Sequence, residues 1–326
     1  INLDMVGQNQ ELCKSTLSVD RTPDSLPSYL NDFMISLLEE TVKEFDSSTM
    51  FGVASTFRYR ANVFTGGSDH AEFVDSTIRV PCVMLLQWPD LFYHTSMDTI
   101  DKVSSESLKR VGWVATVAAL TIADADVNDA LYLANQTGSR GIARIKEAGR
   151  EAIEELYRLN EDPKLKEKPN ELAKSLAKKA FYHRNRLEHV VQREKKAVSS
   201  VKRLASNTEL ENFIDAFTKE ISVAGKTEIA RINEVLSYTA KSTGVSVPNR
   251  IEETETETEK KSKKIVPQRL FKGSLSMDTV KRALTEKEYE WYEEKGKKDA
   301  AFGVKIAEML NFMDGKKTLS NIVKAV

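Results

Sequence analysis

The stretch GGSDHAEFVDSTIRVPCVMLLQWPDLFYHTSMDTIDKVS, residues 66–104, decides how the first part of the chain is interpreted. Its middle, IRVPCVMLLQ (78–87), is a nearly continuous apolar run with several β-branched residues, which predicts a strand covered on both faces. Two of the four histidines, His70 and His94, stand on either side of it among acidic and hydroxyl residues. A buried strand with such neighbours is typical of an α/β sheet that carries a site at its edge.

The surrounding residues continue this α/β pattern through residue 124. INLDMVG (1–7) and TFRYRANVF (56–64) predict two further strands. SYLNDFMISLLEETVKEF (28–45) has apolar residues at helical spacing and predicts an amphipathic helix. SESLKRVGWVATVAALTIADA (105–125) is apolar on nearly every side, so we expect a buried helix that closes a domain spanning 1–124.

The rest of the chain changes in character. Residues 125–245 are rich in Lys and Glu with a 3.6-residue period, which predicts an all-α hairpin or bundle. Residues 246–264 hold a Glu-Thr repeat followed by lysines, a composition typical of a charged linker. Residues 265–326 predict a small C-terminal unit of short helices with a loose resemblance to winged-helix modules. The expected fold class is therefore α/β, followed by an all-α region and this small helical unit.

Composition excludes several classes of function. With a net charge of −1, the chain has no global attraction to nucleic acid or to anionic membranes, and we expect neither as a partner. No apolar run is long enough for a membrane span. Two cysteines without a CxxC pair exclude a zinc–thiolate site and argue against a disulfide framework. The compartment stays undetermined, with the cytoplasm favoured.

Three short elements carry residues suited to chemistry. Asp4 ends a strand, where a side chain is directed towards a sheet edge, although a capping aspartate has the same pattern. His94 is followed by Asp98, and a ligating imidazole needs such an acceptor for its other nitrogen. A turn with two glycines precedes Ser68, Asp69 and His70. These three side chains either face a cleft or serve to hold the loop.

The other two histidines give no metal signal. His183 and His189 are six residues apart on a charged helix, whereas two ligands on one helix face need a spacing of three or four. We therefore expect both to be ordinary residues of a helix surface.

Taken in order, the elements LDMVG, GSDHAEF, VPCVMLL and YHTSMDTIDKVS resemble the second half of the co-catalytic zinc exopeptidases, over residues 1–122. This family includes zinc aminopeptidases and glutamate carboxypeptidases. The resemblance implies that Asp4 ligates one of two zinc ions, that His94 ligates the other, and that Asp98 orients His94. The residues that it places beside the substrate are Ser68, Asp69, His70 and Tyr93.

The resemblance implies a di-zinc exopeptidase, with an aminopeptidase favoured and a peptide with a free N-terminus as substrate. Two zinc ions would polarise the scissile carbonyl and supply hydroxide near neutral pH. The remaining ligands and the general base of the family would stand upstream of Ile1, so we expect them from a longer protein or a second chain. Homo-oligomers are also expected. The alternatives are a carboxypeptidase or deacylase, for which Arg58, Arg60 and Arg79 are available, and a non-catalytic scaffold.

Overall fold

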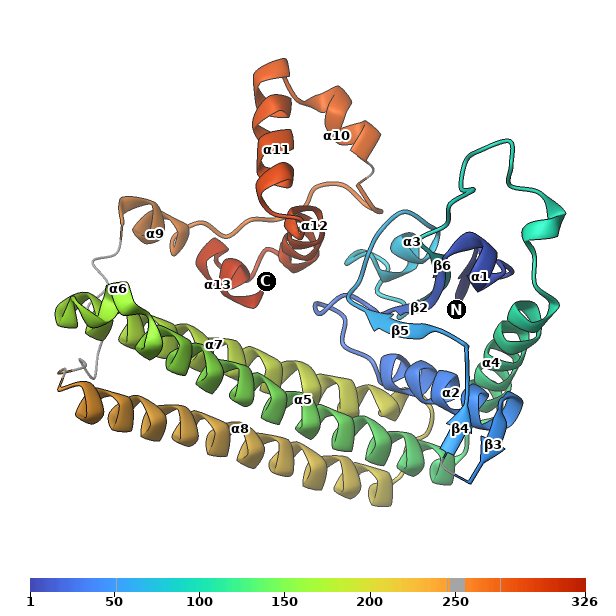
Figure 1. Cartoon of the computed structure of the whole chain (residues 1–326), viewed down its shortest axis with the longest axis horizontal. Helices are drawn as coiled ribbons and strands as arrows, with labels where there is room; N and C mark the ends of the chain where they lie inside the picture. Colours follow the sequence, from blue (N-terminus) through green and yellow to red (C-terminus); the bar gives the residue numbers. More distant parts are fainter. Residues whose placement is uncertain (51, 245, 247–255, 276) are drawn as a thin grey trace. The chain divides into compact units, whose positions relative to one another are not determined.

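The computed structural model describes residues 1–50, 52–244, 246, 256–275 and 277–326, and it holds two compact units (Figure 1). The first unit joins Ile1–Ala130 to Gln268–Lys316, and the second joins Leu131–Pro267 to Lys317–Val326. The chain thus leaves the first unit and later returns to it. The division into four segments expected from composition stays a prediction. Residues 247–255 of the expected linker lie outside the described residues.

The first unit is built on a mixed sheet with the strand order β1-β6-β2-β5. Its strands are β1 (Asn2–Asp4), β2 (Thr16–Asp20), β5 (Tyr59–Asn62) and β6 (Met84–Trp88). β1 runs parallel to β6 and β2 parallel to β5, whereas β6 and β2 are antiparallel. The predicted α/β class is confirmed, and the apolar run of 78–87 supplies a central strand that begins only at Met84.

The central strand β2 was not predicted, although it is more completely buried than β6. Leu17 and Val19 are fully buried on one face, and Ser18 and Asp20 are buried on the other. The sequence TLSVD alternates polar and apolar side chains, which is the pattern of a strand with one exposed face, but both faces of this strand are buried. The alternation was thus present in the sequence, but over only five residues, and it was not used to predict a strand.

Helices flank the sheet, and Figure 1 shows the strands between α2 and α3. The helices of this part are α1 (Gln10–Cys13), α2 (Tyr29–Phe45), α3 (His70–Val74) and α4 (Ser105–Asp124). Ser28 caps α2 and Ser104 caps α4, each by accepting a backbone N–H. The predicted helix at 28–45 is confirmed. The expectation that α4 is buried all round is wrong, because Leu108 and Leu120 are exposed while Val111 and Val114 are buried.

The returning segment adds helices to the same unit. They are α10 (Met277–Ala283), α11 (Glu286–Lys298) and α12 (Phe302–Phe312). Ala307 of α12 packs against a buried cluster made of Leu26, Phe64, Val74 and Cys82. The short elements that complete the unit are the hairpin strands β3 (Ser47–Thr49) and β4 (Gly52–Ala54), and the 3-10 turn η1 (Ile100–Lys102).

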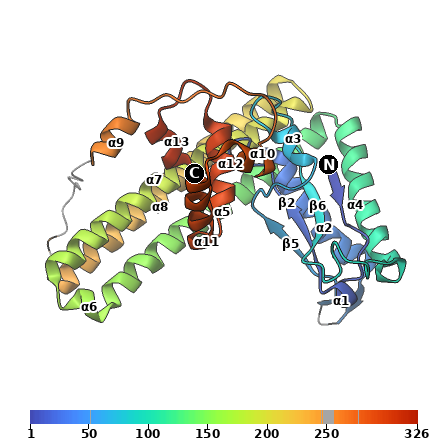
Figure 2. The ribbon, with the colours of Figure 1, turned by 90° about the horizontal axis from the view of Figure 1, so that it is seen from above.

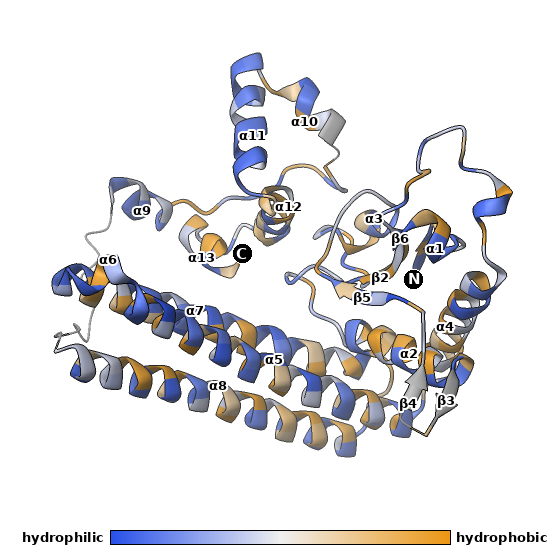
Figure 3. Cartoon of the chain, in the orientation of Figure 1, coloured by the Kyte–Doolittle hydropathy of each residue, from blue (hydrophilic) through white to orange (hydrophobic). Residues whose placement is uncertain are grey.

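The second unit is dominated by three long helices that run side by side in Figures 1 and 2. They are α5 (Val127–Glu161, which begins in the first unit), α7 (Pro169–Ser199) and α8 (Thr208–Thr243). Figure 3 shows hydrophobic and hydrophilic patches alternating along them, as expected for amphipathic helices. The all-α region predicted for 125–245 is confirmed.

Short elements complete the second unit. They are α6 (Pro163–Lys166), η2 (Ser200–Arg203), α9 (Glu257–Ser262) and α13 (Leu319–Ala325). α9 lies inside the expected linker and begins at a capping box between Thr256 and Glu259. α13 contacts α7 and α9, and its Ile322 is fully buried. Within the described parts of the chain, every helix is too short or too polar to cross a lipid bilayer.

Candidate metal and peptide site

The first candidate element is the end of β1, where Asp4 lies half-buried. Met5, next in the chain, has a left-handed backbone with φ 48°, so the strand ends there. Asn2 donates from Nδ2 to Ser68 Oγ over 2.7 Å. Side chains two residues apart on a strand project to the same face. Asp4 therefore shares its face with the contact between β1 and the glycine-rich loop at 65–70.

His70, the first residue of α3, is fully buried beneath this loop. Its Nε2 lies 2.6 Å from the carbonyl oxygen of Thr65. A carbonyl oxygen can only accept, so Nε2 carries the hydrogen and Nδ1 of the neutral ring does not. Burial lowers the pKa of His70, against the opposing effects of the Thr65 bond and the nearby charges of Asp20, Asp4 and Asp69. The neutral ring is the form that this site favours.

Asp20 is a site residue that the sequence analysis missed. It ends β2, is almost fully buried, and accepts a hydrogen bond from Asn62 Nδ2 over 2.9 Å. Its second carboxylate oxygen accepts from the hydroxyl of Thr65, the residue whose carbonyl holds His70. Asp20 thus anchors the glycine-rich loop to the sheet. The signal was present, since LSVD (17–20), like NLD (2–4), ends a short strand with an aspartate.

The remaining predicted residues lie together in the loop between β6 and α4. His94 is exposed, has φ 57°, and stacks on Tyr93 with ring centroids 3.7 Å apart. Tyr93 in turn meets Trp88 edge-on at 5.3 Å. Burial, together with the charges of Asp90 and Asp98, raises the pKa of Cys13. Its predicted role in orienting His94 stays a prediction.

The structure therefore forms two clusters: Asp4 with the loop of Ser68, Asp69 and His70, and His94 with Tyr93. Among the residues that the structure describes, no hydrogen bond, ion pair or ring contact joins Asp4 to His94. The same residues contain no group of three or more His, Cys, Asp or Glu side chains arranged for a metal ion.

A carboxylate and an imidazole are suitable zinc donors, but catalytic zinc takes three protein ligands. The described residues thus supply suitable donor types but not a complete metal centre.

The arginines considered for a carboxylate-binding alternative are differently placed. Arg58 donates to Glu11, to the carbonyl of Gln10 and, over 3.2 Å, to the carbonyl of Ser15. Its guanidinium is thus occupied in holding β5 to the α1 region. Arg60 and Arg79 are exposed, and Arg79 has φ 60°.

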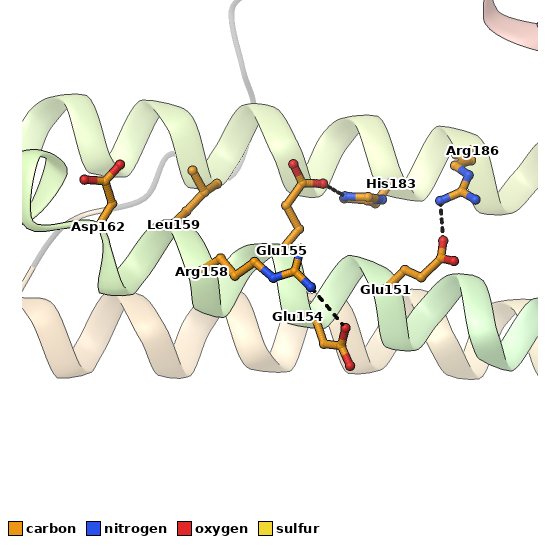
Figure 4. Close-up of a pocket in the computed structure, with 8 residues that line it drawn as sticks. All are labelled: Glu151, Glu154, Glu155, Arg158, Leu159, Asp162, His183 and Arg186. Carbon is orange, nitrogen blue, oxygen red and sulfur yellow. Dashed lines mark hydrogen bonds and ion pairs between the residues drawn. The ribbon is translucent and has the colours of Figure 1, made fainter. Parts of the chain in front are cut away.

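The second unit contains a groove of about 560 Å³ between α5 and α7 (Figure 4). His183 lies in it, buried, with Nε2 2.6 Å from Glu155 Oε2, so the expectation of a surface histidine is wrong. Glu151 pairs with Arg186 at 2.8 Å, and Glu154 with Arg158 at 3.5 Å. The Glu151–Arg186 and Glu155–His183 contacts join the two helices, whereas the Glu154–Arg158 pair lies within α5, so the groove is a part of helix packing.

Comparison with known proteins gives a family match for the first part of the chain. Residues 1–119 match the sequence model of peptidase family M28. This confirms the predicted resemblance to the co-catalytic zinc exopeptidases for that part of the chain, and the family is one of metal-dependent peptidases. No curated protein and no solved structure matches the chain.

Proposed function

Because residues 1–119 carry a segment of peptidase family M28, we propose that this chain is part of a di-zinc exopeptidase, with an aminopeptidase favoured. The substrate would be a peptide with a free N-terminus. The observation that carries the proposal is the family match, supported by the Asn2–Ser68 contact that puts Asp4 and the Ser68–His70 loop on one face of β1.

In the proposed site Asp4 and His94 would each hold one zinc ion. Bound zinc would supply a polarised carbonyl and an activated water. Ser68 and Asp69 stand beside the substrate on the loop that Asp20 anchors. Tyr93 holds the ring of His94 by stacking. His70, fully buried, supports this loop from below and stays neutral.

The site requires further ligands and a general base from outside these residues. β1 offers a place for the polypeptide that brings them. It is the edge strand of the sheet, and among the described strands only β6 pairs with it. Leu3 of β1 and Ile1, which precedes the strand, are more than two-fifths exposed, which is unusual for a strand of a parallel pair. We propose that a strand of the completing segment, from a longer protein or a second chain, pairs with this edge.

The proposal is tested by zinc content and by peptide choice. The chain, purified without chelator, is analysed for zinc alone and after mixing with the completing polypeptide. We expect about two zinc ions per completed site, fewer in D4A and H94A, and no loss in R186A as a control. Hydrolysis of N-free but not N-blocked peptides supports the aminopeptidase. Cleavage of both favours the carboxypeptidase or deacylase, and a completed protein without zinc or turnover supports the scaffold.

A further inference from the structure

The returning segment of the first unit, residues 268–316, lies against the helix that begins with His70. This segment is outside the part of the chain that matches the peptidase family. We propose that Arg269 is a positioning residue, which holds α3 and through it the Ser68–His70 loop in place for the substrate. The statement that the loop is held in place for a substrate rests on the proposed peptidase function. The statement that Arg269 holds α3 and the loop does not depend on it.

Arg269 makes the central contact. Its Nη1 donates to Asp75 Oδ2 over 2.8 Å and to Ser76 Oγ over 3.0 Å. Its Nη2 donates to the carbonyl of Gly273 over 2.5 Å. The side chains of Arg269 and Asp75 are only 5% and 4% exposed, so this ion pair is shielded from water. A buried pair of this kind loses far more when one partner is removed than an exposed pair does.

Asp75 is the residue at which α3 ends. Its Oδ1 accepts from the backbone N–H of Thr77 over 2.9 Å and from the Thr77 hydroxyl over 2.6 Å. The carboxylate therefore shapes the turn after the helix with one oxygen and binds Arg269 with the other. Asp75 has a pKa below its ordinary value, because these hydrogen bonds and the Arg269 charge outweigh its burial. The carboxylate is thus ionised and fixed.

Further contacts from the same segment hold both the helix and its turn. Glu72 of α3 accepts from the hydroxyl of Ser274 and, over 3.3 Å, from its backbone N–H. Gly273 donates from its backbone N–H to Thr77 Oγ1 over 3.1 Å. From α12, Asn311 Oδ1 accepts from the backbone N–H of Ser76 over 3.1 Å. These bonds span about two hundred residues of sequence, and all of them converge on 72–77.

Movement at the end of α3 reaches the site because the helix is short. It has five residues, His70–Val74, or little more than one turn. The backbone N–H groups of Ala71 and Glu72 bond to the carbonyls of Ser68 and Asp69 over 3.1 Å each. A displacement of α3 must therefore also displace Ser68, Asp69 and the His70 ring. Asp20 holds the loop from the sheet side, and Arg269 holds it from the helix side.

The test compares R269A and R269K with K305A in the full chain. Lys305 is the matched control, since it lies in the same segment and its ion pair with Asp299 is about half exposed. Amide hydrogen exchange is followed over residues 68–80. We expect exchange there to be faster by about tenfold or more in R269A, to be intermediate in R269K, and to be unchanged in K305A. Lysine retains the charge for Asp75 but cannot also reach Ser76 and Gly273.

A second measurement reports on the ring of His70 itself. Nitrogen NMR of histidine rings distinguishes the tautomer with hydrogen on Nε2, which the Thr65 carbonyl imposes. In R269A we expect the His70 ring nitrogen shifts to move towards the values for a mixture of the two neutral tautomers. The shifts of His183 in the second unit should stay unchanged. A change at both histidines, or exchange at 68–80 equal to that of wild type, would overturn the positioning role.

The completed enzyme separates this inference from the proposed function. If N-free peptides are cleaved, R269A should raise KM more than it lowers kcat, and R269K should restore part of the loss. Equal loss in R269A and R269K without a change in exchange would show that the effect does not pass through α3. If no peptide is cleaved by wild type, the proposed function fails, while the exchange and NMR results still decide whether Arg269 positions the loop.

Discussion

Both units contain a buried carboxylate that pairs with arginine, but the separation in sequence between the carboxylate and its arginine differs greatly between the two units. In the second unit, Glu194 is 2% exposed and binds Arg144 and Arg193, which lie on neighbouring helices of one hairpin. In the first unit, Asp75 binds Arg269, 194 residues away. The bundle therefore assembles from contacts between neighbouring helices, whereas the sheet unit is closed by a segment that returns after the whole bundle has intervened.

From this comparison we expect a buried carboxylate to contribute most to the free energy of unfolding where it pairs with two cations. E194A should destabilise the second unit by about 3 kcal/mol or more, because Arg144 and Arg193 lose their common partner. The measurement is calorimetric unfolding with exchange over 140–200 to identify the unit. The first unit should keep its transition. A decrease of the same size in both units would mean that the two do not unfold separately.

Glu308 of α12 provides a pH-dependent version of the same test. Its carboxylate accepts backbone N–H groups of Asp24 over 2.5 Å and Ser25 over 3.1 Å. Burial, aided by the Asp24 charge, raises the pKa of Glu308 to about 7 from 4.5, against the effect of these bonds. A folded state with the higher pKa binds the proton more tightly. The stabilisation is thus complete below about pH 4.5 and is lost as the pH rises through 7.

We expect the first unit to lose on the order of 2 kcal/mol of unfolding free energy between pH 5 and pH 8 from this group alone. E308Q removes the titrating proton and should flatten the profile, as seen by urea unfolding at each pH. The profile of the second unit serves as the internal reference. An E308Q profile as steep as that of wild type would assign the dependence to other groups.

Helix contact in the bundle can be tested at a glycine. A Cβ added at Gly149 of α5 would lie 2.9 Å from Cβ of Glu228, a buried residue of α8. G149A should therefore destabilise the second unit by about 1–2 kcal/mol through overpacking. The matched control is G112A in α4, where nothing lies within 4 Å. There the better helix propensity of alanine should raise stability by up to ~1 kcal/mol. Opposite signs in thermal unfolding would confirm the close approach of α5 and α8.

The smallest effect is expected from an exposed ion pair between α5 and α7. Arg186 and Glu151 join α5 and α7 at 2.8 Å, but both side chains are more than two-fifths exposed. R186A should cost about 0.2–1 kcal/mol, and less at high salt. A loss as large as that of E194A, measured by the same unfolding experiment, would contradict the view that burial sets the value of these pairs.

Much of the candidate site was visible in the sequence because its residues occur in short elements with fixed order. Asp4 was placed at the end of a strand, and Ser68, Asp69 and His70 were assigned to a loop after two glycines. Asp20 was missed, because the sequence alone does not distinguish a buried aspartate from one in a turn. Its hydrogen-bond partners, Asn62 and Thr65, are known only from the structure. That no contact joins His94 to Asp4 among the described residues was also not predictable, because it depends on the path of a loop.

The sequence by itself determined the element types: a mixed-polarity first region with short apolar runs, and long helices with a 3.6-residue period after residue 125. These follow from local spacing of side chains, which every residue carries with it. Only the tertiary structure decided that residues 268–316 return to the sheet, that Arg269 meets Asp75, and that Glu308 is buried against Asp24 and Ser25. Such pairings depend on long-range packing, for which an isolated arginine or glutamate gives no periodic signal.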